Sequence, residues 1–323
     1  MKALCIGYGS MGKRRIRLLK KIDRSWEILC VDSNDIRRKE VVKDGFKAFE
    51  SLNTALTECP DIAFVCTTPL AHADIIVTLL EHKIPTFTEL NLSSSRYDDI
   101  LMLSQNNNVV LFMSNTKLYS KQIQKIKALV HQQTKPLSYM YHIGQYLPDW
   151  HPWESYTSFF AAKKESNGCR EIFAIQLPWL INTFGDIETL SSISNKSSAL
   201  DIPFNDTYVV SFKHKNGNIG TVLVDVVCRE ATTYLEVIGE EIHLIWDGKN
   251  NGLFNYNIST KQREKLELLS VVNHEDGYAE NIIENDYEAE IRDFLSAVYN
   301  HTVPLYSLAK DKEILSIIDE IEK

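Results

Sequence analysis

Three glycines near the amino terminus constrain this chain more than any other feature. They follow the short apolar run of residues 3–6 in the order G-x-G-x-x-G. In a strand–turn–helix unit the first glycine makes the tight turn, the second lets the backbone approach a pyrophosphate, and the third lets the helix pack on the sheet. The phosphates would lie on free N–H groups of that helix. The pattern predicts a dinucleotide-binding loop made of Gly7, Gly9, Ser10, Met11 and Gly12.

The residues around this loop agree with that prediction. Residues 3–6 and 26–31 read as buried parallel strands, and residues 11–21 between them read as a helix. Asp32 follows Gly12 at the spacing where a carboxylate reaches an adenosine ribose. A carboxylate accepts a hydrogen bond from a 2′-hydroxyl but repels a 2′-phosphate, so the predicted cofactor is NAD.

Two arginines after Asp32 keep NADP open as an alternative. Guanidinium groups at Arg37 and Arg38 could bind a 2′-phosphate. Arginines at such a place can equally form a solvated helix face.

The length and the order of elements predict two domains with different architectures. A chain of 323 residues with 44% hydrophobic content can bury two cores. Residues 1–118 alternate strand and helix, which predicts an N-terminal doubly wound parallel sheet, a Rossmann domain. Residues 119–323 are expected to form an α+β substrate-binding and oligomerisation domain. The predicted strands of the first domain are 3–6, 26–31, 61–66, 84–88 and 109–113, with helices at 11–21, 72–82 and 94–105.

The second domain is expected to contain an open, mostly antiparallel sheet. Asn216-Gly217, between apolar segments 207–215 and 218–228, predicts a hairpin with a type I′ turn. Segments 232–238 and 242–246 continue the sheet. Two amphipathic helices are expected to close the chain, the first with Tyr287, Ile291, Phe294, Leu295 and Val298 on one face and the second with Ile314, Leu315, Ile318 and Ile321.

Charge and cysteine usage argue against several classes of partner. The net charge is −8 and no concentrated basic face is evident, so nucleic acid is not expected as a partner. The six cysteines form no C-x-x-C pair, which predicts a reducing compartment and no metal site. Neither a signal peptide nor a membrane-spanning stretch is visible, so we expect no membrane partner and a cytoplasmic protein.

Motifs spread over the chain resemble those of the Gfo/Idh/MocA family of oxidoreductases. They are the run Gly7–Arg14, the sequence Thr68-Pro69-Leu70-Ala71-His72, Glu89, and the spacing Tyr287-x-x-Glu290-x-x-x-Phe294. The resemblance implies a nicotinamide at the carboxyl edge of the first sheet and a sugar-type substrate oxidised or reduced at a hydroxyl carbon. It also implies a homodimer or homotetramer joined through the open sheet. By the same resemblance, the cofactor would be lined by Thr67, Thr68, Pro69, His72 and Glu89, which without it read as an ordinary strand-to-helix turn.

The chain departs from this family at the two positions that carry proton transfer. The usual Glu-Lys-Pro is Glu89-Leu90-Asn91 here, so the expected amine is missing. Where the family has an Asp followed by a His, alignment to Gly185 places Glu171 and Ile175. Hydride transfer still requires a titratable group at the substrate oxygen. Another residue must supply it, or the protein is catalytically silent.

His151 and Glu171 are the candidates for this proton carrier, and we expect both near the nicotinamide. His151 has a suitable intrinsic pKa, and Glu171 would need burial to raise its pKa. His151 lies in an aromatic loop whose Trp150 and Trp153 could stack on a sugar ring, or could fold back onto the sheet instead. Tyr119 is a further substrate-lining candidate by position.

Arg170 is a candidate for binding a carboxylate or phosphate of the substrate. The alternative is an ion pair with a structural role, and Glu171 is its neighbour in sequence.

Two functions are therefore compatible with the sequence. The first is an NAD-dependent oxidoreductase acting on a sugar or sugar derivative, with surface-polysaccharide synthesis as one setting. The second is a silent NAD- or sugar-binding sensor of the same fold, which the missing lysine and histidine favour.

Overall fold

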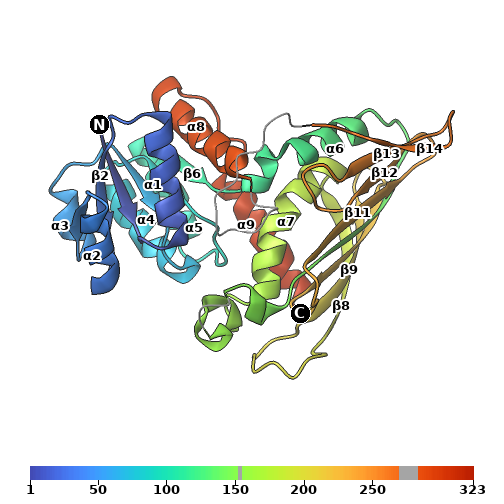
Figure 1. The fold of residues 1–323 in the computed structure, drawn as a ribbon, viewed down its shortest axis with the longest axis horizontal. Helices are drawn as coiled ribbons and strands as arrows, with labels where there is room; N and C mark the ends of the chain where they lie inside the picture. The colour runs from blue at the N-terminus through green and yellow to red at the C-terminus, as the bar shows by residue number, and fades with distance from the viewer. Residues whose placement is uncertain (152–154, 269–282) are drawn as a thin grey trace. The chain divides into compact units, whose positions relative to one another are not determined.

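The computed structural model describes residues 1–151, 155–268 and 283–323 (Figure 1). These residues form two compact units, one of residues 1–116 with 285–313 and one of residues 117–284 with 314–323. The units differ from the predicted division after residue 118 because helix α8 (Glu284–Asn300) packs with the first unit. None of the helices in the described ranges is long and apolar enough to cross a bilayer.

Unit 1 is built on a six-stranded parallel sheet in the order β3-β2-β1-β4-β5-β6. The order reverses between β1 and β4, and ligands of open α/β sheets bind at the carboxyl ends of strands at such a point. The strands are β1 (Lys2–Ile6), β2 (Glu27–Val31), β3 (Lys47–Phe49), β4 (Ile62–Val65), β5 (Thr86–Thr88) and β6 (Leu111–Met113). The helices that connect them are α1 (Ser10–Ile22), α2 (Asp35–Lys43), α3 (Leu52–Leu56), α4 (His72–Glu81) and α5 (Tyr97–Asn107). The predicted Rossmann sheet is confirmed.

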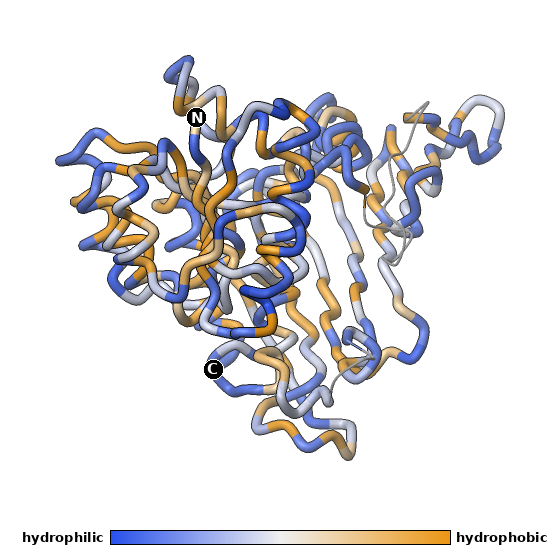
Figure 2. The backbone as a smooth tube through the Cα atoms, turned by 60° about the vertical axis from the view of Figure 1, so that its left-hand side comes forward, coloured by the Kyte–Doolittle hydropathy of each residue, from blue (hydrophilic) through white to orange (hydrophobic). Residues whose placement is uncertain are grey.

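Aromatic packing explains why α8 belongs to unit 1. The ring of Phe294 lies 5.5–5.7 Å from the rings of three sheet residues, Phe64 on β4, Phe87 on β5 and Phe112 on β6, each at a steep angle. All four rings are almost fully buried. Edge-to-face contacts add to the large apolar area that such rings bury. In Figure 2 the strands of this unit are largely orange, because both faces of the sheet are covered.

Unit 2 is built on an eight-stranded mixed sheet in the order β14-β13-β12-β11-β7-β10-β9-β8. Among the described strands of this sheet only β7 and β10 pair in parallel, and the other pairs are antiparallel. The strands are β7 (Ser138–Gly144), β8 (Ile187–Asn195), β9 (Thr207–His214), β10 (Ile219–Asp225), β11 (Thr232–Ile238), β12 (His243–Trp246), β13 (Leu253–Asn257) and β14 (Gln262–Lys265). The predicted mostly antiparallel sheet is confirmed, and helix α6 (Lys121–His131) precedes it.

Helix α7 (Gly168–Phe184) lies on one face of this sheet, and several described side chains on the other face are exposed. On the covered face Tyr139 stacks on Phe184 and Tyr141 meets Trp179 edge-on. Alternate residues point to the opposite face. There Met140 is 50% exposed and Ile219 52% exposed. An open apolar sheet face is therefore a property of unit 2 considered by itself.

The predicted type I′ turn between β9 and β10 is wrong. That turn needs a positive φ at both central residues, but among the described residues only Gly217 of this pair has one, +88°. The N–H of His214 donates to the carbonyl of Asn218, which encloses a three-residue loop. The side-chain amide of Asn216 donates to the carbonyl of Phe184 at the end of α7, a tertiary bond that the local sequence does not reveal.

Candidate active site

The glycine loop has space where a pyrophosphate would lie. Gly7 has φ +97°, and a Cβ at Gly12 would come within 2.0 Å of the Gly7 carbonyl oxygen, so neither position accepts a side chain. A Cβ at Gly9 would meet only Arg37, 3.8 Å away. Helix α1 starts without a side-chain cap and without an acidic residue in its first turn. Its first N–H groups can therefore bind an anion, so the loop fits the phosphates of a dinucleotide.

Asp32 is held in place by the backbone on both sides. Its Oδ2 accepts a hydrogen bond from the N–H of Tyr8 at 2.8 Å, and its Oδ1 accepts one from Asn34 at 2.8 Å. Each carboxylate oxygen retains accepting capacity for a ribose hydroxyl. Arg38 donates from Nη1 to the carbonyls of Asp32 and Ser33, and its Nη2 lies 3.4 Å from the Asp35 carboxylate.

The alternative of a 2′-phosphate site therefore depends on Arg37. Its side chain is 51% exposed, and its Nη1 lies 3.7 Å from Oδ2 of Asp32. A 2′-phosphate at this place would face the Asp32 carboxylate as well as Arg37, and the repulsion favours the unphosphorylated ribose.

His72 joins the two strand-end loops of the predicted cofactor site. It is 2% exposed, its Nε2 lies 3.0 Å from the Thr67 carbonyl oxygen, and its Nδ1 lies 2.6 Å from the Asn91 side-chain oxygen. Burial lowers the pKa of His72, so the ring is neutral and can donate from one nitrogen only. Turning the Asn91 amide satisfies both groups, because its NH2 has no other partner among the described residues. Nδ1 then accepts from Asn91, and Nε2–H donates to Thr67.

Asn91 is a further residue at the predicted cofactor site that sequence analysis did not identify. It stands where the related family has a proline, and the polar amide of a buried asparagine needs a partner. That departure was the available signal. Thr68 precedes the short 3-10 helix Pro69–Ala71 and leaves the strand in an extended conformation. Thr67, Thr68 and Pro69 thus form the loop that the His72 imidazole holds, and their contact with a cofactor stays a prediction.

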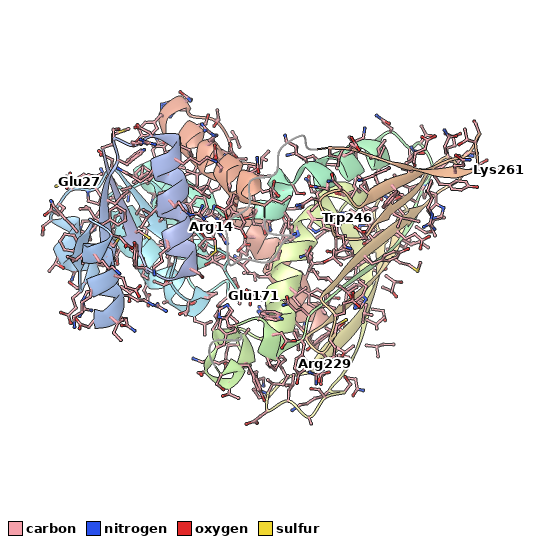
Figure 3. The ribbon with its side chains drawn as sticks, in the orientation of Figure 1. Arg14, Glu27, Glu171, Arg229, Trp246 and Lys261 are labelled. Carbon is pink, nitrogen blue, oxygen red and sulfur yellow. The ribbon has the colours of Figure 1, made fainter. Side chains whose placement is uncertain are left out.

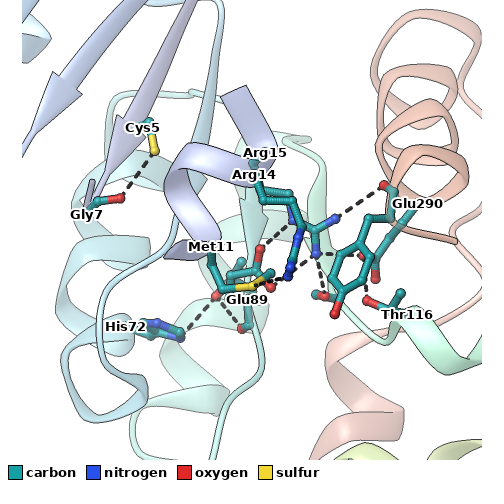
Figure 4. Close-up of polar contacts among 12 residues, drawn as sticks. Cys5, Gly7, Met11, Arg14, Arg15, His72, Glu89, Thr116 and Glu290 are labelled. Atoms are coloured by element: carbon teal, nitrogen blue, oxygen red, sulfur yellow. Dashed lines mark hydrogen bonds and ion pairs between the residues drawn. The ribbon is translucent and has the colours of Figure 1, made fainter. Parts of the chain in front are cut away.

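Glu89 is bound by a buried arginine (Figure 4). Arg15, which is fully buried, donates from Nε to Glu89 Oε1 at 2.5 Å and from Nη2 to Glu89 Oε2 at 3.1 Å. Its Nη2 also pairs with Oε2 of Glu290 on α8, at 2.7 Å. Burial raises the pKa of Glu290 despite the opposing effect of Arg15. The Glu89 carboxylate therefore organises the end of β5, and a direct contact with the cofactor stays a prediction.

Glu171 lies in the first turn of α7 (Figure 3). The N-cap residue Asn167 accepts the Arg170 N–H at 2.7 Å and so fixes the start of this helix. The residue keeps some exposure, but its Oε2 is enclosed and has no hydrogen-bond partner among the described residues. Burial raises the pKa of Glu171 to about 8. A carboxyl with such a pKa is mostly protonated at pH 7 and can give or take a proton near neutral pH. Ile175 lies one helical turn further along.

The other residues of unit 2 that were predicted for the site each have their own contacts. Arg170 pairs with Asp319 at 2.7 Å and with Glu322 at 2.5 Å, so the ion-pair alternative holds, with partners on and just after α9 (Leu308–Ile321). Trp150 donates to the Gln145 carbonyl. Its ring lies 3.2 Å from where a Cβ of Gly168 would be, so it packs on the start of α7, one turn before Glu171.

Three residues of the prediction remain. The ring of His151 packs on that of Phe159, with 4.0 Å between centroids. Tyr119 is buried in the 3-10 helix Thr116–Tyr119. Trp153 lies outside the described residues. Substrate contacts by Arg170, Tyr119, Trp150 and Trp153 stay predictions.

Comparison with solved structures shows the fold over the whole chain. An oxidoreductase from Agrobacterium radiobacter, in complex with NAD+, L-tartaric acid and magnesium, is 15% identical at a TM-score of 0.84, covering 99% of this chain and 94% of the other. UDP-N-acetylglucosamine 3-dehydrogenase from Acidithiobacillus ferrooxidans is 15% identical at 0.77, covering 100% and 96%. The WlbA dehydrogenase from Chromobacterium violaceum, in complex with NADH and UDP-GlcNAcA, is 13% identical at 0.79, covering 99% and 92%.

Comparison of the sequence identifies the first domain. No curated protein matches the chain. Residues 1–114 match the model of the oxidoreductase family with an NAD-binding Rossmann fold, which is the segment that carries the glycine loop, Asp32, His72 and Glu89. Residues 1–114 are therefore similar to the NAD-binding Rossmann domain of the Gfo/Idh/MocA oxidoreductases.

Proposed function

We propose that this protein transfers a hydride between NAD and a hydroxyl carbon of a sugar or sugar derivative, with Glu171 as the proton carrier. The observation that carries the proposal is the enclosed Glu171 carboxyl, whose pKa of about 8 suits proton transfer although the family's lysine and histidine are absent. Two similar structures, a UDP-N-acetylglucosamine 3-dehydrogenase and one bound to UDP-GlcNAcA, favour a nucleotide-linked sugar as the substrate class.

The residues of the chain have separate parts in this proposal. Bound NAD supplies the carbon that accepts or donates the hydride. The glycine loop and the start of α1 hold its pyrophosphate, and Asp32 holds the adenosine ribose. During oxidation the Glu171 carboxylate takes the hydroxyl proton of the substrate, and during reduction the protonated carboxyl returns it.

The proposal is tested by incubating the full chain with NAD+ or NADH and a panel of neutral, acidic and nucleotide-linked sugars. Mass spectrometry reads loss or gain of two hydrogens on any sugar. Turnover of one panel member supports the enzyme. A protein that binds NADH but turns over no member, in either direction, contradicts it.

A silent sensor is the second candidate, and Leu90 is the observation that favours it. An apolar side chain stands where the family has its amine, and it can neither donate nor accept a proton. If Glu171 carries the proton, Leu90→Lys should lower activity, because the new ammonium lies beside a Glu89 carboxylate that Arg15 already binds. If the chain is silent, Leu90→Lys could give weak activity from none. Side-by-side assays of NAD reduction separate the two, since wild-type turnover contradicts the sensor and activity gained only in the variant contradicts the Glu171 mechanism.

Asp32→Ala should weaken NADH binding and reduce the preference for NADH over NADPH. The change removes an acceptor for the ribose and a negative charge that repels a 2′-phosphate, while Arg37 remains. Fluorescence titration of both cofactors measures the two affinities. Asp35→Ala, an exposed carboxylate on α2, is the matched control. Tighter binding of NADPH than NADH by the wild-type protein would contradict the role of Asp32.

We also propose that the open face of the eight-stranded sheet joins copies of this chain into a homodimer or homotetramer. The exposed apolar side chains on that face, Met140 and Ile219 among them, support it. Sedimentation equilibrium of the full chain measures the state, and a monomer at assay concentration would contradict the proposal.

A further inference from the structure

Three side chains with metal-binding atoms meet at one end of the sheet of unit 2. His142 is on β7, Asp225 ends the parallel neighbour β10, and Cys228 lies in the connection to β11. One ligand atom from each lies within 4.8 Å of the other two. His142 follows Tyr141, which faces α7, so the imidazole is on the open face of the sheet.

The carboxylate at the centre of this group is already oriented. Asp225 Oδ2 lies 2.8 Å from Nε2 of His142. Its Oδ1 accepts hydrogen bonds from the N–H groups of Val227 at 3.0 Å and Cys228 at 2.7 Å. These bonds fold the connection back so that the Cys228 thiol lies beside the carboxylate. Outer contacts of this kind hold a ligand in place before a metal binds.

Gly144 gives the carboxylate its space. A Cβ at this position would lie 2.4 Å from Asp225 Oδ2, so any other residue opposite Asp225 would displace the group. The absence of a side chain at residue 144 is thus matched to the position of the acid. The His142 side chain is 29% exposed, which leaves access for an ion and for a water ligand.

We propose that His142, Asp225 and Cys228 bind a zinc ion, with water as the fourth ligand. One imidazole nitrogen, one carboxylate oxygen and one sulfur form a donor set that suits Zn2+ and does not suit Mg2+ or Ca2+, which prefer oxygen ligands only. Binding releases the Cys228 thiol proton to solvent, and the ring hydrogen that Nε2 of His142 directs at Asp225 moves to Nδ1, so that Nε2 can bind the metal. The metal would tie β7 to the connection between β10 and β11.

The rearrangement required is small and involves all three side chains. Zinc bonds of about 2.0–2.3 Å bring ligand atoms closer together than 4.8 Å. The His142 and Asp225 atoms lie 2.8 Å apart in a hydrogen bond, whereas two ligands at about 2.0 Å from a tetrahedral zinc lie about 3.3 Å apart, so they must separate slightly. The Cys228 sulfur now lies 3.0 Å from the Glu230 carbonyl oxygen, a weak contact that rotation of the side chain would exchange for the metal.

Equilibrium dialysis of the full chain against Zn2+ tests the proposal. The wild-type protein should bind one zinc ion that Cys228→Ser and His142→Gln do not bind. Loss of an outer-shell partner costs about 10–100-fold in metal affinity, so loss of the thiolate should cost at least about 100-fold. Cys59→Ser removes an exposed thiol elsewhere and should bind as the wild type does.

Cobalt binding to the wild-type protein tests the same site without any substitution. Co2+ added to the wild-type protein should give the near-ultraviolet charge-transfer band of a cobalt–thiolate bond, and Zn2+ should abolish it. The proposal is overturned if the wild-type protein retains no zinc, if Cys228→Ser retains as much, or if cobalt binds without that band. Wild-type turnover of sugars plays no part in these outcomes, so the zinc site and the proposed oxidoreductase activity can fail separately.

Discussion

Glu171→Gln is expected to lower turnover by about 10²-fold or more while leaving NADH affinity unchanged. Glutamine keeps the shape and one acceptor but cannot exchange a proton near neutral pH. The cofactor residues identified above lie in unit 1, whereas Glu171 is on α7. Initial rates with a turned-over sugar and NADH fluorescence titration measure the two effects.

The pH dependence of the two reaction directions tests whether Glu171 is the proton carrier. With a pKa of about 8, Glu171 is protonated below that pH and ionised above it. Reduction, which needs the acid, should fall as the pH rises through about 8, and oxidation, which needs the base, should rise there. Both limbs should disappear in Glu171→Gln. Glu165→Gln, an exposed carboxylate just before α7, is the matched control.

His151→Asn tests the other candidate in the same assay. If His151→Asn loses activity and Glu171→Gln does not, the proton carrier is His151. If both variants keep wild-type turnover, neither residue is the acid or base.

Measuring the free energy of unfolding distinguishes a loss of proton transfer in Glu171→Gln from damage to its fold. Burial raises the folded-state pKa of Glu171 from an ordinary 4.5 to about 8, so the folded state favours the protonated form. Stability is therefore lost as the pH rises from about 4.5 to about 8, by a few kcal/mol at about 1.4 kcal/mol per pKa unit. Glu171→Gln lacks this penalty and should be at least as stable as the wild type at pH 8, measured by urea unfolding.

Arg15→Met is expected to have the largest effect on stability, a loss of about 3–5 kcal/mol. The change leaves the buried Glu290 and the partly buried Glu89 without their shared guanidinium, and it removes the stack of Arg15 on Phe87 at 4.4 Å. Such a loss is a large part of the total stability of a typical domain. Urea unfolding at pH 7 measures it.

A surface ion pair on the same helix provides the control. Lys13→Met breaks the ion pair between Lys13 and Glu40, whose side chains are both nearly half exposed. It should lower the free energy of unfolding by no more than about 1 kcal/mol. Without Arg15 the pKa of the buried Glu290 carboxyl rises further, so the loss of stability should be smaller at pH 5 than at pH 8. Adding Glu89→Gln and Glu290→Gln should recover part of the loss. A cost equal to that of Lys13→Met would contradict the buried network.

Short-range rules explain which parts of the fold were predictable from sequence. Gly7, Gly12 and Asp32 are constrained by backbone geometry within one strand–helix–strand unit, and their spacing is visible in the sequence. The alternation of strands and helices up to residue 118 is similarly local. The turn at Asn216 was mispredicted because its amide binds the carbonyl of Phe184, more than 30 residues away in sequence.

The candidate site shows the same limit. Burial of Glu171, and hence its raised pKa, depends on what surrounds α7 and has no local signature. The partners of Arg170 are Asp319 and Glu322, at the far end of the chain. Asn91 could be noticed as a departure from a motif, but its bond to His72 depends on the packing of α4 beside β5. Side-chain partners across long sequence separations decide these roles.

The contribution of α8 to unit 1 has a consequence for how the protein is made. During synthesis Phe112 leaves the ribosome about 180 residues before Phe294, the ring that covers it. At a translation rate of about 5–20 residues per second, the aromatic surface of the NAD-binding sheet stays uncovered for roughly 10–40 s until Phe294 is synthesised. A nascent chain paused before residue 294 therefore exposes the apolar surface of an incomplete domain. Chaperone binding should be strongest in that interval.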